Sequence, residues 1–85
     1  MRSTGAVITE IIEAYSEHWG QWARLEEIAA PAGLTRDELE AAITELMEDG
    51  SFRAEPQPVR SRLTDWDREN APIIGGEARH IIRWE

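Results

Sequence analysis

Apolar and polar positions in the first half of the chain follow the spacing of amphipathic helices, in which apolar residues recur at three- and four-residue steps. The first predicted helix covers residues 4–19, and Gly20 directly after it provides a natural stop. Its apolar stripe consists of Val7, Ile8, Ile11, Ile12, Tyr15 and Trp19.

Two more helices are expected after the first. Residues 24–30 form a short one that ends at Pro31, because proline disfavours helical geometry in the preceding residue and lacks an N–H. Residues 35–49 form a longer one, in which Thr35 and Glu38 have the spacing of a capping box. The buried stripe of this third helix consists of Leu39, Ala42, Ile43, Leu46 and Met47.

The apolar period changes to two after residue 50, which is typical of strands. One strand is expected to begin at Phe52, and residues 78–84 are expected to form a second that pairs with it antiparallel. In the second strand Ala78, His80, Ile82 and Trp84 alternate with Arg79, Ile81 and Arg83. Residues 21–23 are either a brief strand or an extended connector. Together these elements predict an α+β fold.

A long excursion, residues 56–77, separates the two strands. Pro56 and Pro58 end the strand pairing early. A short helix is expected from Thr64 to about residue 70, and the Gly75-Gly76 pair turns the chain back.

Residues 23–52 resemble the winged helix-turn-helix superfamily of small bacterial and archaeal regulators. The residues that carry the resemblance are Leu25, Ile28 and Ala29 in the second helix, the Gly33-Leu34 turn, Thr35 and Leu46 in the third helix, and the Asp49-Gly50 turn. The resemblance implies one domain over residues 1–85, with three helices (4–19, 24–30 and 35–49) followed by a wing over 51–85. In DNA-binding members the third helix enters the major groove. The implied reading positions are Arg36, Asp37, Glu40, Ala41 and Thr44, with Glu45 and Glu48 beside them.

The charge of that helix opposes DNA. The net charge of the chain is −8, and all of it falls in residues 1–50, which have eleven acids and three arginines. Duplex DNA carries one negative charge per ~1.7 Å of axis and is bound largely through Lys and Arg. We therefore predict a protein-interaction module in a regulatory or DNA-transaction context. The residues expected to contact a protein partner are Asp37, Glu40, Thr44, Glu48 and Trp66; a merely solvated acidic face is the other interpretation.

Two alternative functions remain open. The first is a DNA-binding transcription regulator, which would use the arginines of the third helix and the wing: Arg36, Arg53, Arg60, Arg62, Arg79 and Arg83. The other interpretation of the wing arginines is that they pair with the nearby acids Asp65, Asp67, Glu69 and Glu77. The second alternative function is an oligomerising unit with the first helix as its interface, and the sequence leaves the oligomeric state undetermined.

The tryptophans divide by their surroundings. Trp19 and Trp84 are expected in the core, since both lie on apolar stripes. Trp66 lies between two aspartates in a polar loop. It is either an exposed anchor for a partner or the residue that packs this loop onto the body of the domain.

Residue types argue against catalysis. The chain has no cysteine, which excludes disulfides, thiolate metal sites and cysteine nucleophiles. The acids at 65, 67 and 69 have the start of a calcium-loop spacing, but Asn70 and Gly76 stand where that loop needs Gly and Glu. We expect no enzyme, no metal and no cofactor. No apolar run is long enough for a bilayer, so we expect no membrane partner. A domain this small without cysteine fits a reducing environment, so we expect a cytoplasmic location.

Overall fold

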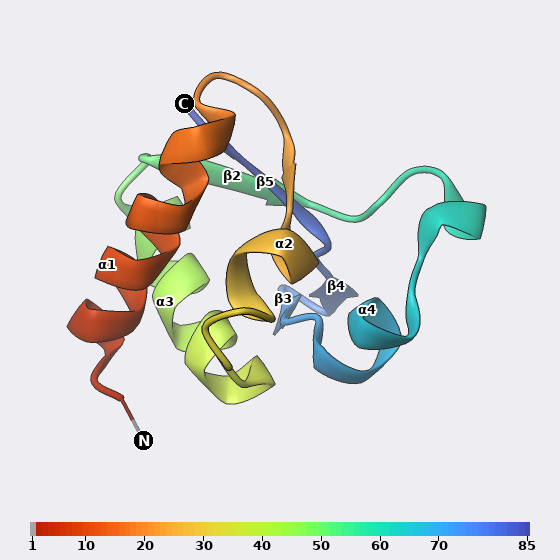
Figure 1. Ribbon diagram of the computed structural model, residues 1–85, viewed down its shortest axis with the longest axis horizontal. Helices are drawn as coiled ribbons and strands as arrows, with labels where there is room; N and C mark the ends of the chain where they lie inside the picture. The colour runs from red at the N-terminus through yellow and green to blue at the C-terminus, as the bar shows by residue number, and fades with distance from the viewer. Residues whose placement is uncertain (1) are drawn as a thin grey trace.

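Helices and a small antiparallel sheet share one hydrophobic core in the computed structural model, which describes residues 2–85 (Figure 1). The predicted α+β class is confirmed. The α-helices are α1 (Thr4–Tyr15), α2 (Leu25–Ala29), α3 (Arg36–Glu48) and α4 (Asp65–Asn70), with 3-10 turns η1 (Ser16–His18) and η2 (Arg60–Arg62). The strands are β1 (Ala23–Arg24), β2 (Phe52–Glu55), β3 (Ile73–Ile74), β4 (Glu77–Ala78) and β5 (Ile81–Trp84).

The main sheet has three strands in the order β1-β5-β2, and both pairings are antiparallel. The predicted pairing of the strand at Phe52 with the C-terminal strand is confirmed, with Phe52 opposite Trp84. Ile82 in the central strand lies opposite Ala23 on one side and Ala54 on the other, and all three side chains are buried. The inner face of the sheet therefore packs on the helices.

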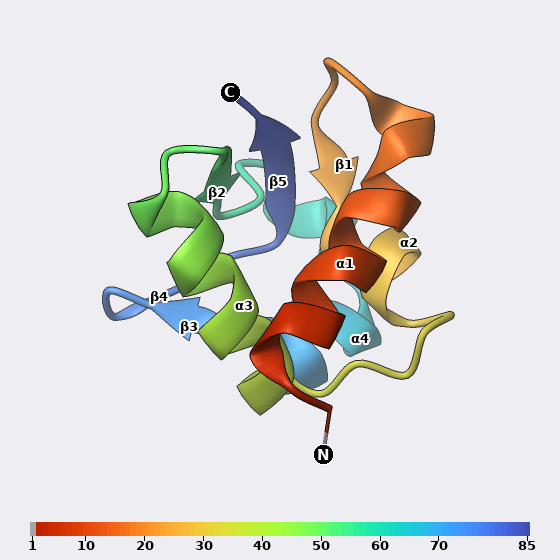
Figure 2. The ribbon, with the colours of Figure 1, turned by 90° about the vertical axis from the view of Figure 1, so that its left-hand side faces the viewer.

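Helices α1 and α3 lie side by side against this inner face (Figure 2). Each contributes side chains at three- and four-residue steps, as the apolar pattern predicts. Fully or almost fully buried are Val7, Ile11 and Tyr15 in α1 and Leu39, Ala42 and Ile43 in α3. The Thr35 hydroxyl accepts a hydrogen bond from the Glu38 backbone N–H, and the Glu38 carboxylate accepts one from the Thr35 backbone N–H, so the predicted capping box is confirmed.

The first helix is shorter than predicted. It ends at Tyr15, a 3-10 turn follows, and Trp19 leaves helical geometry with ψ 124°. The expectation that Trp19 belongs to the core is wrong: its side chain is 56% exposed and stacks on Trp84 with 4.9 Å between ring centroids. Trp84 is half-buried and packs against the core. The second helix is also shorter, because Arg24 pairs in β1.

The excursion between β2 and β5 has structure of its own. Helix α4 begins after Thr64 and ends at Asn70, as predicted, and a second capping box joins Thr64 to Asp67. The expected single strand over 78–84 is interrupted at residues 79–80. Ala78 instead pairs with Ile73 in a β3–β4 hairpin, because Gly75 and Gly76 turn the chain with φ of 64° and 81°.

A buried tyrosine hydroxyl joins three segments of the fold. Tyr15 donates a hydrogen bond to the Gln21 carbonyl (2.6 Å) and accepts one from the Trp84 N–H (3.0 Å). Its ring also contacts Phe52 edge-on, with 5.1 Å between centroids. The end of α1, the loop before β1 and the end of β5 are therefore held together at one atom.

Tyr15→Phe removes this atom and leaves one part-buried backbone donor and one acceptor without their protein partner. We expect a loss of ~1–3 kcal/mol in the free energy of unfolding, measured by urea denaturation with tryptophan fluorescence. Ser51→Ala, which removes an exposed hydroxyl bond to Asp49, is the control and should change stability by less than ~0.5 kcal/mol. Equal effects of the two substitutions would contradict this account.

The Glu38 carboxylate is held by hydrogen bonds that favour its charged form. The Thr35 and Arg2 backbone N–H groups donate to it at 3.0 and 3.1 Å. The Arg2 guanidinium lies 3.9 Å away. The Thr35 backbone bond, followed by the Arg2 backbone bond, lowers the pKa of Glu38 below its ordinary value of 4.5.

A lowered pKa in the folded state stabilises the fold above the ordinary value and loses that effect as the pH falls through the lowered value. We therefore expect the stability difference between the wild type and Glu38→Gln to be largest near neutral pH and to shrink below about pH 4.5. Unfolding midpoints measured across this range test it. A Glu38→Gln difference that is constant with pH would contradict the prediction.

Candidate functional site

The outward side of α3 divides into a covered stripe and an exposed stripe. Arg36, Glu40 and Thr44, spaced four residues apart, are half-buried. The exposed stripe consists of Asp37, Ala41, Glu45 and Glu48. The residues expected to contact DNA or a protein partner thus fall into two groups with different environments.

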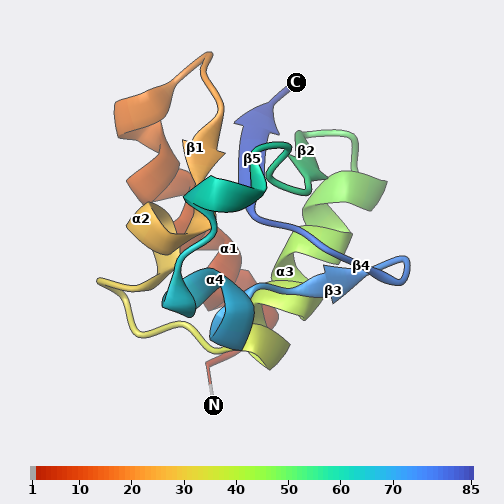
Figure 3. The ribbon, with the colours of Figure 1, turned by 90° about the vertical axis from the view of Figure 1, so that its right-hand side faces the viewer.

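The segment after α4 occupies the covered stripe. Arg36 donates from Nε to the Ala71 carbonyl at 3.0 Å and from Nη2 to the Arg68 carbonyl at 3.1 Å. The Ile73 N–H donates to Glu40 Oε2 at 2.8 Å. Figure 3 shows α4 and the β3–β4 hairpin beside α3. Arg36 and Glu40 therefore hold the excursion against the helix.

A groove of about 660 Å³ runs between α1 and the end of α3. Its apolar lining comes from Ile8, Ile12, Leu46 and Trp84, and its polar lining from Glu45, Glu48, Asp49 and Ser51. Ile12 is 37% exposed, and Trp19 adds an exposed indole where it stacks on Trp84. No cationic side chain lines this groove among the described residues. It therefore combines an apolar floor with a negatively charged rim.

The five residues expected to contact a protein partner do not form one surface. Glu48 lines the groove and Asp37 is exposed near the start of the same helix. Glu40 and Thr44 belong to the covered stripe. Trp66 is half-buried and packs against the core, so of its two interpretations the structure favours packing of the loop onto the domain.

The wing arginines also have separate environments. Arg79 is only 14% exposed and donates to the Ala54 carbonyl (2.9 Å) and the Ile74 carbonyl (3.0 Å). Its Nη2 also lies 3.5 Å from Glu77 Oε1. Within residues 2–85 this is the only ion pair that joins one of these wing arginines to an acid expected to pair with it. Arg53 pairs instead with Glu55 and Glu85. Exposed and without an ion pair within residues 2–85 are Arg60, Arg62 and Arg83.

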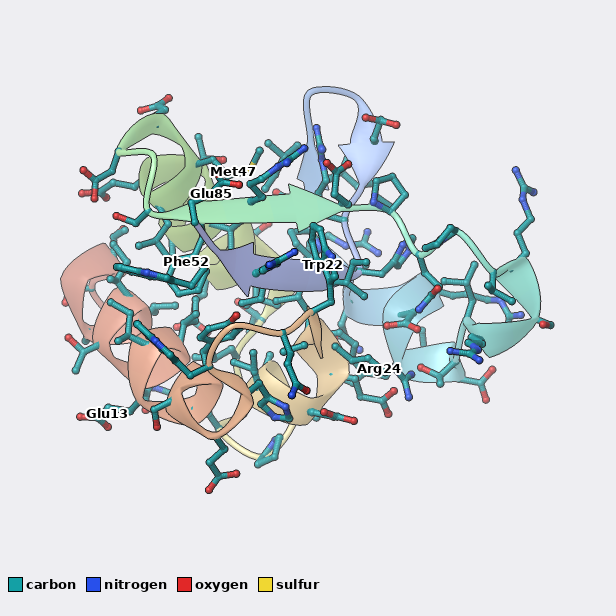
Figure 4. The ribbon with its side chains drawn as sticks, turned by 90° about the horizontal axis from the view of Figure 1, so that it is seen from above. Glu13, Trp22, Arg24, Met47, Phe52 and Glu85 are labelled. Carbon is teal, nitrogen blue, oxygen red and sulfur yellow. The ribbon has the colours of Figure 1, made fainter. Side chains whose placement is uncertain are left out.

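A second and larger groove, about 850 Å³, lies on the outer side of the sheet. It is lined by Trp22, Arg24, Glu55, Pro56, Gln57, Pro58, Arg62 and Ile81. The sequence pattern assigned no role to Trp22. The alternation of side chains along β5 places Ile81 on the side of the sheet away from the core. Trp22 is 40% exposed, and Figure 4 shows it with Arg24 on the segment beside β5.

His80 and Asp67 are used in contacts within the domain. His80 Nδ1 accepts a hydrogen bond from the Gln57 N–H at 2.9 Å. Asp67 closes the α4 capping box and lies 3.6 Å from Arg24. Within residues 2–85 no three potential metal ligands are grouped together, and none of the helices there is long and apolar enough to cross a membrane.

Comparison of the chain with protein-family models, with curated proteins and with solved structures finds no significant match. The functional assignment therefore depends on the surfaces described above.

Because Arg36 holds the excursion through two backbone carbonyls, Arg36→Gln should lower the free energy of unfolding by ~1.5–3 kcal/mol. It should also accelerate amide hydrogen exchange at Ile73, whose N–H bonds to Glu40 on the same stripe. Arg68→Gln is the matched control, since Arg68 is exposed and makes one side-chain contact, with Asp65. Unchanged exchange at Ile73 in Arg36→Gln would show that Arg36 does not hold this segment.

Proposed function

We propose that the chain is a winged helix-turn-helix domain that acts as a protein-interaction module and binds a basic amphipathic segment of a partner in the groove between α1 and α3. The order of elements supports the fold assignment: helix, short strand, two helices, strand, excursion and strand. The regulatory or DNA-transaction context rests on the resemblance of residues 23–52 alone.

The observation that carries the binding proposal is an exposed apolar floor beside unpaired carboxylates. Ile12 and Trp19 leave apolar surface in water, which stabilises an interface when a partner covers it. Glu45 and Glu48 form no ion pair within the described chain. A helix with apolar residues on one face and Lys or Arg beside them complements both features.

The covered stripe of α3 argues against major-groove reading by this helix. Arg36, its only cation, already donates to two carbonyls within the domain. The exposed stripe carries Asp37, Glu45 and Glu48, which repel phosphates. A partner protein with a basic segment meets none of these obstacles.

The test uses a fluorescein-labelled 18-residue peptide of Leu and Lys arranged as an amphipathic helix, with a scrambled peptide of equal composition. Fluorescence anisotropy should detect binding of the ordered peptide, and Ile12→Ser should weaken it about tenfold, equivalent to ~1.4 kcal/mol. The double variant Glu45→Lys/Glu48→Lys should weaken it at least as much.

Glu17→Lys/Glu69→Lys is the matched control, because it changes the net charge equally at two exposed acids outside the groove. It should leave most of the affinity intact. Equal losses in both double variants, or equal binding of the scrambled peptide, would reduce the effect to general charge attraction and refute the groove. A dimer at high concentration that Ile12→Ser dissociates would instead assign the groove to a second copy of the chain.

A further inference from the structure

The outer face of the sheet brings together an indole, an aliphatic side chain and several guanidinium groups. Since β1, β5 and β2 pair in register, Arg24, Ile81 and Glu55 lie side by side across the sheet. Arg83 and Arg53 lie opposite each other one pleat further along. Both are exposed, because their neighbours Ile82 and Ala54 point into the core. This face is separate from the α1–α3 groove.

The second groove continues this face beyond the strand ends. Its apolar lining comes from Trp22, Ile81, Pro56 and Pro58, and its charged lining from Arg24, Glu55 and Arg62. Its volume of about 850 Å³ is within the range of sites that take a nucleotide-sized ligand.

The cations of this face differ in how far they are already used. Arg24 is fixed by Glu26 at 2.9 Å and Asp67 at 3.6 Å. Arg62 and Arg83 form no ion pair with any residue from 2 to 85. Of these two guanidinium groups, Arg62 lines the groove together with Trp22, and Arg83 lies two residues beyond Ile81 on the same face of β5.

We propose that this face binds single-stranded nucleic acid, with a base stacked on Trp22 and phosphates held by Arg62 and Arg83. Aromatic side chains beside arginines are the common means of holding single strands without sequence preference. A duplex hides the flat faces of its bases, so it has nothing to stack on Trp22. An acidic peptide satisfies the arginines and leaves the apolar lining of Trp22, Ile81 and two prolines without a planar partner.

The acids on this face are already paired, Glu55 and Glu85 with Arg53, and Glu26 and Asp67 with Arg24. The acids of α1 and α3 lie on the opposite side of the core from the outer face of the sheet. Exposed charges further apart than about 8 Å are largely screened at physiological salt. Local charge therefore governs a strand lying on the outer face.

The experiment measures fluorescence anisotropy of a labelled fifteen-residue oligothymidylate with the full chain over a range of NaCl concentrations. Wild-type protein should bind, and Trp22→Ala should weaken binding about tenfold while Trp22→Phe retains most of it. Arg62→Gln and Arg83→Gln should each weaken binding and together reduce the slope of log affinity against log salt by about 1.4. Arg68→Gln, an equal charge change on exposed α4, should leave binding unchanged.

Three results would overturn the proposal: no binding of the oligonucleotide at low salt, equal losses in Arg68→Gln and Arg62→Gln, or tighter binding of a labelled Glu- and Pro-rich peptide that depends on the same residues. The last would make the face a site for an acidic protein segment. Melting curves confirm that each variant is folded, and Trp22→Ala should leave Leu/Lys peptide binding unchanged. Loss of oligonucleotide binding would therefore leave the proposed peptide binding in the α1–α3 groove unaffected.

Discussion

The hydroxyl of Tyr15 is a polar atom inside an apolar core, and it satisfies two backbone groups that are 63 residues apart in the chain, at Gln21 and Trp84. Buried polar groups need such partners, because an unmatched one is costly. The contact fixes the end of β5 against the end of α1. It thereby positions Trp84 at the end of the α1–α3 groove and, through β5, Ile81 in the outer groove. Both candidate surfaces depend on this one junction.

The two surfaces have opposite chemistry because the core separates them. On the helical side, carboxylates border Ile12 and Leu46. On the outer side of the sheet, guanidinium groups border Trp22. The excursion over 56–77 contributes to this division twice. Its first residues form a wall of the outer groove, while its later residues cover half of the outward side of α3. The excursion thus forms part of the outer groove and covers part of the outward side of α3.

Local patterns predicted the elements that local physics determines. Three helices, the α3 capping box, helix α4 and the pairing of β2 with β5 all follow from periodicity and cap residues. Trp19 was misplaced because its spacing continues the apolar stripe, whereas the helix ends four residues earlier. The polar partners of Arg36 and Glu40 are backbone groups more than 30 residues away, and no local pattern encodes them. The outer groove escaped prediction because three distant segments build it.

The contact of Arg79 with the Ala54 carbonyl has a consequence for behaviour at high concentration. Strand β2 lies at the border of the main sheet, and an open strand border offers carbonyls and N–H groups to strands from other molecules. Arg79 occupies one of those carbonyls and ties it to the β3–β4 hairpin through Ile74. A charged side chain at this border disfavours intermolecular strand addition. Arg79 thus protects the border of β2 against β-type aggregation, although no fourth strand covers it.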